Sequence, residues 1–533
     1  MPREADRRDL RVELLELRVL DGPNRFFTRP AVKIEFAGDA PGNASTVGAA
    51  AALAVRRLHH ALDLPEPRLT SRHSVDRLRT AVAFTWRRRT ISQAIGAAAA
   101  RLALGRSTDR REVAGLRAVA HGPLSHLPRP QVPVVAVTGT NGKSTTTRLI
   151  THIASSAGRT VGMTNSDGIF VRGELVEAGD WTGFGGAARV LAEPGLDLAV
   201  LETARGGILL RGIGYAANDV SVVTNVSADH LGLQGIDTVD ELADVKAAIV
   251  RITKRDGWVV LNADDPRVWA MRRQTRGNLY AFSLDGRAEA VDAALDAGGR
   301  AASLDDGQLV LRAAGRRPRR LVEAAELPVT FAGLSRYNVA NALAAAAACD
   351  ALGLTTRQIV DGLRTFALDA VTNPGRLNLF ARRGTYVLID FAHNEAGMVG
   401  LLEVARAVAR RGRVRLAFGT AGDRTDEILH RLGVIAGGAD DLIIAEKEHY
   451  LRGRKLEEMN ELLRAGAREG GYSAEIPSVG GELEALRQLL ARSERNDVSV
   501  VMAHVERAEL FGWLKAEGFR PVSSDRLRRR IGT

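Results

Sequence analysis

The spacing of apolar and polar residues separates the first 128 residues from the rest of the chain. Residues 10–20, LRVELLELRVL, alternate apolar and polar positions, as a half-buried strand does. A turn-rich stretch, DGPNRFFTRP, joins that strand to an expected antiparallel neighbour, AVKIEFAG. The expected strands are 10–20, 31–38 and 78–86, and the expected helices are 47–64 and 92–105. Residues 1–128 are therefore predicted to form a small α+β domain, which ends at the proline-rich linker GPLSHLPRPQVP.

From residue 129 onward, short apolar runs alternate with helical stretches. This order is typical of an α/β fold with a mostly parallel sheet. A central domain, residues 129–369, has its expected strands at 134–139, 160–165, 196–203, 219–226 and 257–264. A smaller C-terminal α/β domain, residues 370–533, has its expected strands at 385–394, 414–423, 440–448 and 498–505. Residues 285–320 are rich in Gly, Ala and Arg, so we expect an irregular insertion with short strands there.

Composition limits the class of protein. The chain has 533 residues, and its 45% hydrophobic and 26% charged residues are ordinary values for a globular protein. The single cysteine, Cys349, excludes an internal disulfide, fits a reducing cytoplasm, and lies in an Ala-rich run that indicates a packed, inert thiol. No apolar run approaches the roughly 20 residues of a membrane span, and the N-terminus MPREADRRDL lacks the apolar core of a secretion signal. We therefore expect a cytoplasmic protein with no membrane partner.

The net charge of +11 raises the question of nucleic-acid binding. The arginines are scattered, with small clusters at 87–89, 316–320 and 528–530, and no aromatic residues are interleaved with them. Solvated surface is the favoured explanation, attraction of an anionic substrate or ATP the second, and a nucleic-acid groove the third. The neighbouring His59 and His60 have no third ligand at metal spacing, so we interpret both as surface residues.

The stretch 134–147, VVAVTGTNGKSTTT, has the pattern of a phosphate-binding loop. A buried strand runs into a Gly-rich turn that opens a helix, so backbone N–H groups and the positive end of the helix dipole meet phosphate oxygens. Lys143 is expected to reach the β/γ-phosphates of a nucleotide, and Ser144 to ligate Mg²⁺. The first glycine of the general pattern is replaced by Val137. The loop's nucleotide-binding candidates are Gly139, Thr140, Asn141, Gly142, Lys143, Ser144 and Thr145.

Polar residues follow the neighbouring strands where each strand ends. They occupy 164–167, 202–205 and 225–230, and ligands of parallel sheets bind at the carboxyl ends of strands. This co-location predicts one active site. Glu202, next to a phosphate loop, supplies the hard oxygen ligand that Mg²⁺ requires, and a solvated strand-end carboxylate is the alternative.

These motifs together resemble the Mur ligase family. The resemblance is closest to the C-terminal, Mur-type half of cyanophycin synthetases and covers about residues 130–470. The matching text is TGTNGKS, GMTNSDGIF, ETARGGIL, TNVSADHLGLQGIDT, VLNADDP, NPGRLNLF, DFAHN and AGDRTDEI. The N-terminal GPNRFFTRPAVKIEF is similar to the opening domain of those synthetases, more weakly. An ATP-grasp domain lies between the two parts in those enzymes, whereas the proline-rich linker leaves no room for one here.

The resemblance implies the roles of further residues around a nucleotide. His230, supported by Asp229, would bind a second Mg²⁺, and Lys246 would be carbamylated and help to bind it. Without the resemblance, Lys246 would be interpreted as a lysine on a helix surface. Asn338 and Asn341 would face the nucleotide, although Asn338 alone is compatible with helix capping. Other implied nucleotide contacts are Arg376, Asp390 near the ribose, and Tyr337, which replaces a histidine and is available to stack on adenine. Phe391 and Glu395 replace Tyr and Pro of the family's DYAHNP element, and the lost proline changes the loop there.

The implied reaction is ATP-dependent amide bond formation. ATP phosphorylates a substrate carboxylate, an amine attacks the acyl phosphate, and Lys143 with the metals neutralises charge on the phosphoryl group. The catalytic residues implied are Lys143, Glu202, His230 and Lys246, and the metal ligands are Ser144, Glu202, His230 and Lys246. The substrate candidates for the acceptor are Thr164, Asn165, Ser166, Asp167 and Arg205. Those for the incoming amine are Asp423, Arg424 and Asp426, with the loop around Arg452 and Arg454, and His393 is a further substrate candidate.

Two other functions stay open at this point. A non-catalytic nucleotide-binding partner of a separate ATP-grasp ligase is one, and a folylpolyglutamate-type ligase is the other. The joint presence of Lys143, Glu202 and His230 with Lys246 disfavours the first, and the text around Asp167 and Arg205 disfavours the second. Small-molecule or peptide substrates are expected as partners, with a separate ATP-grasp enzyme and self-association left open, and nucleic acid is not expected.

Overall fold

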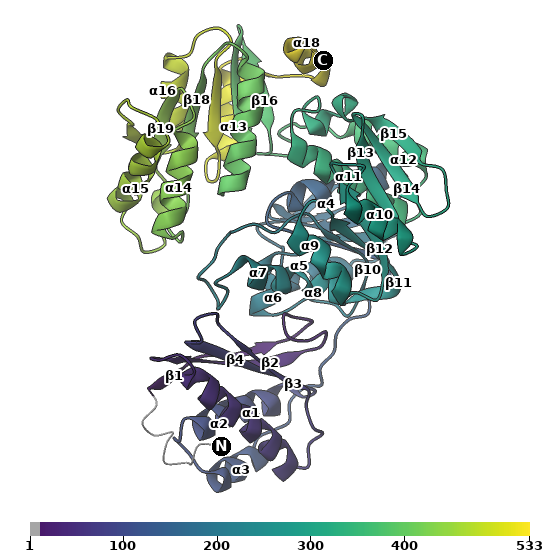
Figure 1. The fold of residues 1–533 in the computed structure, drawn as a ribbon, viewed down its shortest axis with the longest axis vertical. Coiled ribbons are helices and arrows are strands. Elements are labelled where there is room, and N and C mark those ends of the chain that lie inside the picture. The colour runs from purple at the N-terminus through teal and green to yellow at the C-terminus, as the bar shows by residue number, and fades with distance from the viewer. Residues whose placement is uncertain (1–10, 533) are drawn as a thin grey trace. The chain divides into compact units, whose positions relative to one another are not determined.

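The computed structural model describes residues 11–532 (Figure 1). Of these, residues 11–139 and 158–280 form one compact unit, and residues 140–157 and 281–532 form a second. The chain passes between the units after Gly139, inside the predicted phosphate loop, after Ala157 and after Tyr280. The expected strand at 10–20 begins at Val12, and the N-terminal stretch MPREADRRDL lies outside the described residues.

The N-terminal part of the first unit is the expected α+β layer. Its antiparallel sheet has the strand order β1-β2-β4-β3, and helices α1 and α2 cover one face around an apolar core. The expected strands and helices are confirmed, whereas β3 and α3 were not predicted. The bounds are β1 Val12–Leu20, β2 Ala31–Gly38, β3 Leu69–His73, β4 Arg79–Thr85, α1 Asn43–Ala61, α2 Arg89–Ala103 and α3 Asp109–Arg117.

The prediction that His59 is a surface residue is wrong. Its side chain is buried at 5% exposure, Nδ1 lies 2.8 Å from the carbonyl oxygen of Val55, and the ring meets the edge of Phe84. Burial lowers the pKa of His59. The apolar face of α1 continues through its last turn, and His59 falls on that face, while His60 is exposed as expected.

A mostly parallel sheet forms the rest of the first unit. Within this unit the strand order is β11-β10-β5-β9-β6-β7-β8, and all five strands expected from the sequence are present and parallel. The bounds are β5 Val134–Thr138, β6 Val161–Thr164, β7 Gly168–Val171, β8 Glu174–Ala178, β9 Leu198–Glu202, β10 Asn218–Val223, β11 Thr253–Asn262, α5 Phe184–Leu191, α6 Arg205–Leu210, α7 Val239–Lys246, α8 Ala248–Arg251 and α9 Pro266–Ala270. The continuous apolar runs follow from burial of the parallel strands on both faces, as in β5, which is entirely buried.

The second unit begins with the helix that the phosphate loop opens. Helix α4 (Lys143–Ser156) packs against α11 (Arg336–Ala351) and α12 (Thr356–Thr365), with Gly362 seated against Ile153. The short strands expected at 285–320 are confirmed, but the stretch is not irregular, because it also forms a helix and its strands pair in antiparallel fashion. Their bounds, with the strand that precedes them, are β12 Asn278–Ser283, α10 Glu289–Asp296, β13 Arg300–Asp305, β14 Gln308–Ala313 and β15 Arg319–Glu323. The buried residues of β13 are small, Ala301, Ala302 and Ser303, whereas those of β14 are larger, Leu309, Val310 and Leu311.

A second α/β sheet completes this unit. Its order is β20-β19-β18-β21-β17-β16-β22, and the expected strands are the four parallel ones at its centre. The bounds are β16 Asn378–Arg382, β17 Thr385–Asp390, β18 Val414–Phe418, β19 Asp441–Ala445, β20 Ser478–Val479, β21 Val498–Met502, β22 Arg520–Pro521, α13 Glu395–Ala409, α14 Asp426–Ala436, α15 Leu456–Glu469, α16 Glu482–Ala491, α17 Arg507–Ala516 and α18 Ser524–Ile531. Cys349 is buried, as expected. Across residues 11–532, every helix is too short or too polar to cross a bilayer.

Candidate active site

Strand register brings several predicted residues to one edge of the parallel sheet in the first unit. Glu202, the last residue of β9, is the partner of Val137 in β5, and Val223 of β10 is the partner of Thr138. Thr164, the last residue of β6, pairs with Leu201. The carboxyl ends of β6, β9, β5 and β10 are therefore adjacent, and the predicted residues that follow them share this edge.

The alternatives that placed Glu202 and Lys246 in solvent are wrong. Glu202 is only 4% exposed and Lys246 only 3%. Lys246, the last residue of α7, donates from Nζ to the carbonyl oxygen of Gly139 at 2.6 Å. A lysine that is almost fully buried requires a partner, and this one holds the backbone at the start of the phosphate loop.

The backbone around Gly139 leaves no space for a side chain. Gly139 has φ +155°, and a Cβ there would lie 1.9 Å from Oγ1 of Thr224. Two further bonds tie the end of β5 to the end of β9: Thr203 N donates to Val137 O at 2.8 Å, and Thr138 Oγ1 donates to Thr203 O at 2.6 Å. The loop is thus supported from both neighbouring strands, and only a glycine fits at position 139.

The loop that carries His230 is supported by Arg205. The Arg205 guanidinium donates to the carbonyl oxygens of His230, at 2.7 Å, and Leu233, at 2.9 Å. His230 itself has a left-handed φ of +51°, and its Nε2 lies 3.9 Å from Oδ1 of Asp229, so the expected support of His230 by Asp229 stays a prediction. Arg205 therefore fixes the shape of this loop, and its predicted contact with an acceptor stays a prediction.

The predicted acceptor residues after β6 form a tight turn. Thr164 and Asn165 are buried, and Oδ1 of Asn165 accepts bonds from the N–H groups of Asp167, at 2.8 Å, and Gly168, at 3.1 Å. Ser166 and Asp167 are half-buried. The turn thus presents Ser166 and Asp167 at its tip, while Asn165 has a structural role that the sequence did not reveal.

The second unit supports the other half of the phosphate loop from α11. Gly142 has φ +83°, and a Cβ there would lie 2.2 Å from Oδ1 of Asn341. The same oxygen accepts a bond from Oγ1 of Thr146 at 3.3 Å, and Nδ2 of Asn341 donates to Oδ1 of Asn338 at 3.0 Å. The alternative that Asn338 caps the helix is wrong, because Ser335 is the cap residue and accepts from the Asn338 N–H.

Two asparagines outside the predicted site also contact the phosphate loop. Asn394 and Asn141 exchange a pair of side-chain hydrogen bonds, at 2.9 and 3.2 Å, and Asn373 donates to Oγ1 of Thr145 at 3.5 Å. Lys143 donates from Nζ to the carbonyl oxygen of Thr140 at 2.9 Å. Asn394 belongs to the DFAHN segment that resembles the family, and this resemblance is the sequence feature that could have identified it.

Arg376, Asp390 and Tyr337 lie together in the second unit. Asp390 is 7% exposed and accepts bonds from the N–H groups of Leu377 and Ala392. Burial raises the pKa of its carboxyl, while the Arg376 guanidinium works in the opposite direction. Arg376 stacks on the ring of Phe391, with 4.4 Å from Cζ to the ring centroid. Burial and the Asp390 charge raise the pKa of Tyr337 well above its ordinary value.

The predicted amine-binding residues lie on two loops at the carboxyl ends of β18 and β19. Asp423 pairs with Arg452, and Asp426 pairs with Arg454 at 2.5 Å. Arg454 also donates to the carbonyl oxygen of Arg424 at 3.0 Å, so the two loops are bound to each other. His393, in a separate loop, lies 3.2 Å from the carbonyl oxygen of Phe391 through Nδ1. Acceptance of an amine by these residues stays a prediction.

The Glu202 carboxylate of the first unit fits a divalent cation that is completed by nucleotide phosphates. Within residues 11–532, no three His, Cys, Asp or Glu side chains form a ready-made metal site. Mg²⁺ is typically held by one or two carboxylates together with substrate phosphates and waters. Glu202 is buried at the end of β9 and is an oxygen ligand of that kind. The Ser144 hydroxyl, at the first turn of α4 in the second unit, stays a predicted ligand.

Comparison with known proteins agrees with this geometry. The Mur ligase middle domain matches residues 137–349, and the Mur ligase glutamate ligase domain matches residues 375–505. A cyanophycin synthetase of Nostoc sp. is 38% identical over 392 residues, which are 73% of this chain and 43% of that protein. The UDP-N-acetylmuramoyl-L-alanyl-D-glutamate–2,6-diaminopimelate ligase of Alkalilimnicola ehrlichii is 30% identical, with 70% of this chain and 72% of the relative covered.

The chain belongs to the Mur ligase family. The match spans less than half of the length of the cyanophycin synthetases. Among solved structures, E. coli FolC in complex with DHPP and ADP aligns with a TM-score of 0.53 at 20% identity, covering 73% of this chain and 90% of FolC. A pseudomurein peptide ligase type C from Methanothermus fervidus aligns with a TM-score of 0.51 at 19% identity, covering 73% and 79%. These two likenesses confirm the predicted fold class.

Proposed function

We propose that this protein is an ATP-dependent, ADP-forming amide ligase. ATP converts a substrate carboxylate into an acyl phosphate, an amine attacks the acyl carbon, and an amide forms as phosphate leaves. The observation that supports this most is the phosphate loop, which is held by Lys246 at Gly139 in the first unit and by Asn394 at Asn141 in the second. Membership of the Mur ligase family supplies the chemical class.

The loop's own groups account for the phosphoryl-transfer half of the reaction. Backbone N–H groups of the loop and the N-terminus of α4 bind the phosphates, and the Lys143 ammonium neutralises charge that builds up on the transferring group. Asn338, Asn341, Arg376 and Asp390 bind the nucleotide in this proposal. Their dense hydrogen bonding fixes them before the substrate arrives, which lowers the reorganisation needed during transfer.

The proposed metal is Mg²⁺. When bound, it neutralises the phosphate oxygens and polarises the transferring phosphoryl group. Ser144 and Glu202 hold the first ion, and His230 with a carbamylated Lys246 holds the second. Burial of Lys246 supports this role, because a charge is costly there unless it is paired, and a carbamate would pair with the cation.

The proposed substrates are small amino-acid or peptide-like molecules. The acceptor carboxylate is bound at the turn after β6, where Ser166 and Asp167 form the tip, and beside the loop supported by Arg205. The amine is bound by the loops that contain Asp423 and Asp426, and His393 is a further substrate residue in the second unit. Arginine side chains already neutralise both aspartates, so a substrate would compete with or extend these pairs.

Phosphate release is the experiment that tests the proposal. Purified protein is supplied with ATP, Mg²⁺ and a panel of amino acids and dipeptides, in all acceptor and amine pairings. Lys143→Ala is expected to lose release by at least about 100-fold, the scale for removing a charge-stabilising group. Lys254→Ala is the matched control. Lys254 lies near the start of β11, in the same sheet as β5, and pairs with Asp219 of β10.

The outcomes separate the proposed ligase from its alternative. Release that needs both an acceptor and an amine, and that persists in Lys254→Ala, supports the ligase. Nucleotide binding with no release under any pairing would indicate a non-catalytic partner of another ligase and would refute the proposal.

A further inference from the structure

Helix α7 (Val239–Lys246) connects the phosphate loop to the N-terminal domain, residues 11–128. Its last residue, Lys246, bonds to the Gly139 carbonyl oxygen. Its first turn is fixed by a capping box, in which Thr238 and Glu241 exchange bonds between side chain and backbone. Asp244, two residues before Lys246, faces the N-terminal domain. The position of α7 therefore decides where the Lys246 amine lies.

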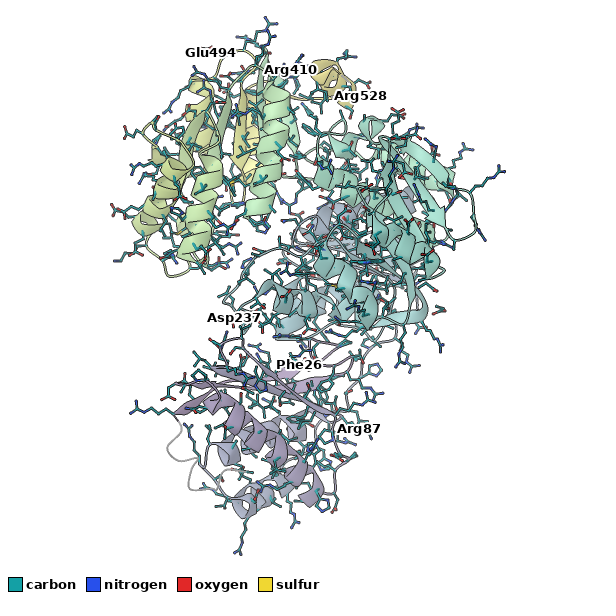
Figure 2. The ribbon with its side chains drawn as sticks, viewed as in Figure 1. Phe26, Arg87, Asp237, Arg410, Glu494 and Arg528 are labelled. Atoms are coloured by element: carbon teal, nitrogen blue, oxygen red, sulfur yellow. The ribbon has the colours of Figure 1, made fainter. Side chains whose placement is uncertain are left out.

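Two arginines of the N-terminal domain bind the acidic face of α7, and a third binds the residue before its cap. Arg25 bonds to Glu241 at 3.2 Å and to Asp244 at 3.1 Å, and its side chain is only 10% exposed. Arg72 bonds to Asp244 at 2.7 Å. Arg79 pairs with Asp237, directly before the capping box, and Figure 2 labels Asp237 there. The pairs of Arg25 are the best shielded from solvent, and shielded pairs are screened less by salt than surface pairs.

The central domain binds back to the N-terminal loop that carries Arg25. Arg251, from α8, pairs with Asp244 at 3.1 Å and donates to the backbone carbonyls of Asn24 and Arg25. The guanidinium of Arg72 also lies over the ring of Phe26, labelled in Figure 2. The loop 21–27 is thus held by side chains from both directions.

The backbones at this interface are in direct contact. A Cβ on Gly22 would lie 1.8 Å from the carbonyl oxygen of Ile213, and Ile213 N donates to Pro23 O at 2.7 Å. A Cβ on Gly235 would lie 2.7 Å from a carboxylate oxygen of Glu35. Contacts of this kind leave no freedom for the two segments to slide.

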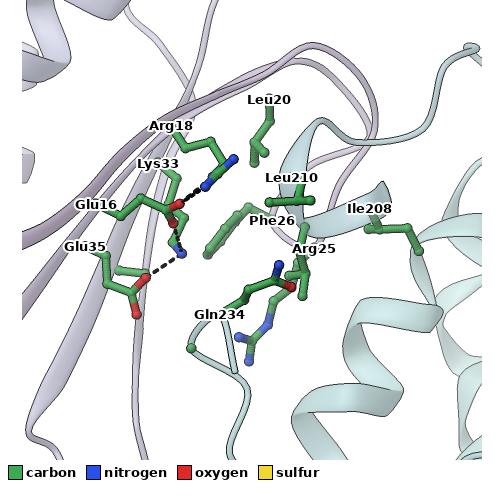
Figure 3. A pocket seen from close by; sticks show the side chains of 13 residues that line it. Glu16, Arg18, Leu20, Arg25, Phe26, Lys33, Glu35, Ile208, Leu210 and Gln234 are labelled. Carbon is green, nitrogen blue, oxygen red and sulfur yellow. Dashed lines mark hydrogen bonds and ion pairs between the residues drawn. The ribbon is translucent and has the colours of Figure 1, made fainter. Parts of the chain in front are cut away.

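The cavity at this interface is too small for a substrate. Its volume is about 30 Å³, which holds about one water molecule. Figure 3 shows Lys33 between Glu16 and Glu35, with Gln234 and Leu210 of the central domain opposite. The charged side chains of the N-terminal sheet pair with one another in this cavity. The interface is therefore a packed contact between the two domains and not a ligand site.

We propose that the N-terminal domain is a clamp for α7, and that Arg25, Arg72 and Arg79 are positioning residues that hold Lys246 against Gly139. The expected effect of the clamp on turnover rests on the proposed ligase function. Its expected effect on the phosphate loop, where it holds Lys246 at Gly139, does not rest on that function. The domain is then needed for activity without binding any reactant at this contact.

Hydrogen exchange of the full chain tests the clamp independently of catalysis. The double variant Arg25→Ala/Arg72→Ala is compared with wild type and with Arg101→Ala. Arg101 forms a two-bond pair with Glu112 in the same domain, away from α7, and is the matched control. We expect amides of 239–246 and of 139–145 to exchange about tenfold faster in the double variant, and not in the control.

Two results would overturn the clamp. One is unchanged exchange in 239–246, and the other is faster exchange there with an unchanged phosphate loop. If the double variant does not fold, the pair Arg79 and Asp237 replaces it: Arg79→Asp and Asp237→Arg each speed exchange in 239–246, and the combined charge swap restores it. If amides 239–246 of the charge-swap variant exchange as fast as those of the single variants, the clamp is also refuted.

Turnover then tests the catalytic consequence. The double variant is expected to lower kcat for phosphate release roughly three- to tenfold and to leave the KM for the amine unchanged, since the amine residues lie in the second unit. If wild type releases no phosphate with any substrate pair, the proposed function fails, and the exchange result still decides the clamp.

Discussion

Replacing Gly142 by alanine should weaken nucleotide binding without unfolding the protein. Gly142 is the cap residue before α4 and has φ +83°, a conformation that L-residues adopt at a cost of about 1–2 kcal/mol. The new Cβ would lie 2.2 Å from Oδ1 of Asn341, a residue that is 4% exposed and bonded to Asn338. Because Asn341 cannot retreat without breaking that bond, the methyl group must displace the loop.

The magnitude follows from these two effects. Overpacking a tight site costs about 1–3 kcal/mol, so the native loop conformation loses about 2–5 kcal/mol in total. The loop is bounded by a helix and a strand that keep their own packing, so we expect it to shift rather than to unfold the unit. A conformation that is about 2 kcal/mol less stable binds ADP about 30-fold more weakly, since affinity scales with its population.

Calorimetric titration with ADP and Mg²⁺ measures this loss. Gly158→Ala is the matched control, because Gly158 follows the other end of α4 with φ +88°, and an added methyl group there would have no atom within 4 Å. The control should keep its ADP affinity within about threefold. Equal ADP affinities for Gly142→Ala and Gly158→Ala would show that the steric fit of the loop against Asn341 is not needed for binding, and the reasoning would fail.

Further predictions concern three ionisable groups. Lys246→Met should lower turnover more than about 100-fold, because the Gly139 carbonyl loses its partner, while circular dichroism stays native. His504 has a pKa held well below 6.5 by burial and by the Lys447 ammonium, so it stays neutral when folded and protonates when unfolded. The neutral His504 therefore contributes to the stability of the fold above about pH 6.5, and this contribution is lost as the pH falls below that value. Between about pH 7 and pH 5, thermal unfolding of His504→Gln should show a smaller loss of stability than that of wild type. Arg415→Met should cost about 3–5 kcal/mol in urea unfolding, because it leaves Asp497 buried without its cation and Asp441 with only the more exposed Arg492, and a cost under about 1 kcal/mol would contradict this.

The sequence predicted the sheet strands well because burial on both faces leaves an unmistakable apolar run. Strands β5, β9 and β10 each combine such a run with a polar residue at or just after the carboxyl end. The sequence therefore predicted that these strand ends share one edge of the sheet and that Glu202 lies there. The turn after β6 was harder, since Asn165 is polar and near the site, yet its side chain serves the backbone.

Other features depend on contacts between residues far apart in sequence. Burial of Lys246 and His59 comes from helix packing, and a lysine or histidine on an amphipathic helix is expected at the surface without it. The bond between Asn141 and Asn394 spans 253 residues, and no local pattern specifies it. The short strands in 285–320 were expected, but helix α10 and the regular antiparallel pairing were not, since alanine and serine fill the buried face of β13 where larger apolar residues are usual.

Isotope labelling can show whether a carboxylate is activated by phosphoryl transfer from ATP. An acceptor whose carboxylate is labelled with ¹⁸O is supplied together with the amine that supports turnover, and the mass of the released phosphate is measured. We expect ADP and inorganic phosphate that contains one ¹⁸O atom for each amide formed. Unlabelled phosphate, or AMP with pyrophosphate, would refute an acyl-phosphate intermediate.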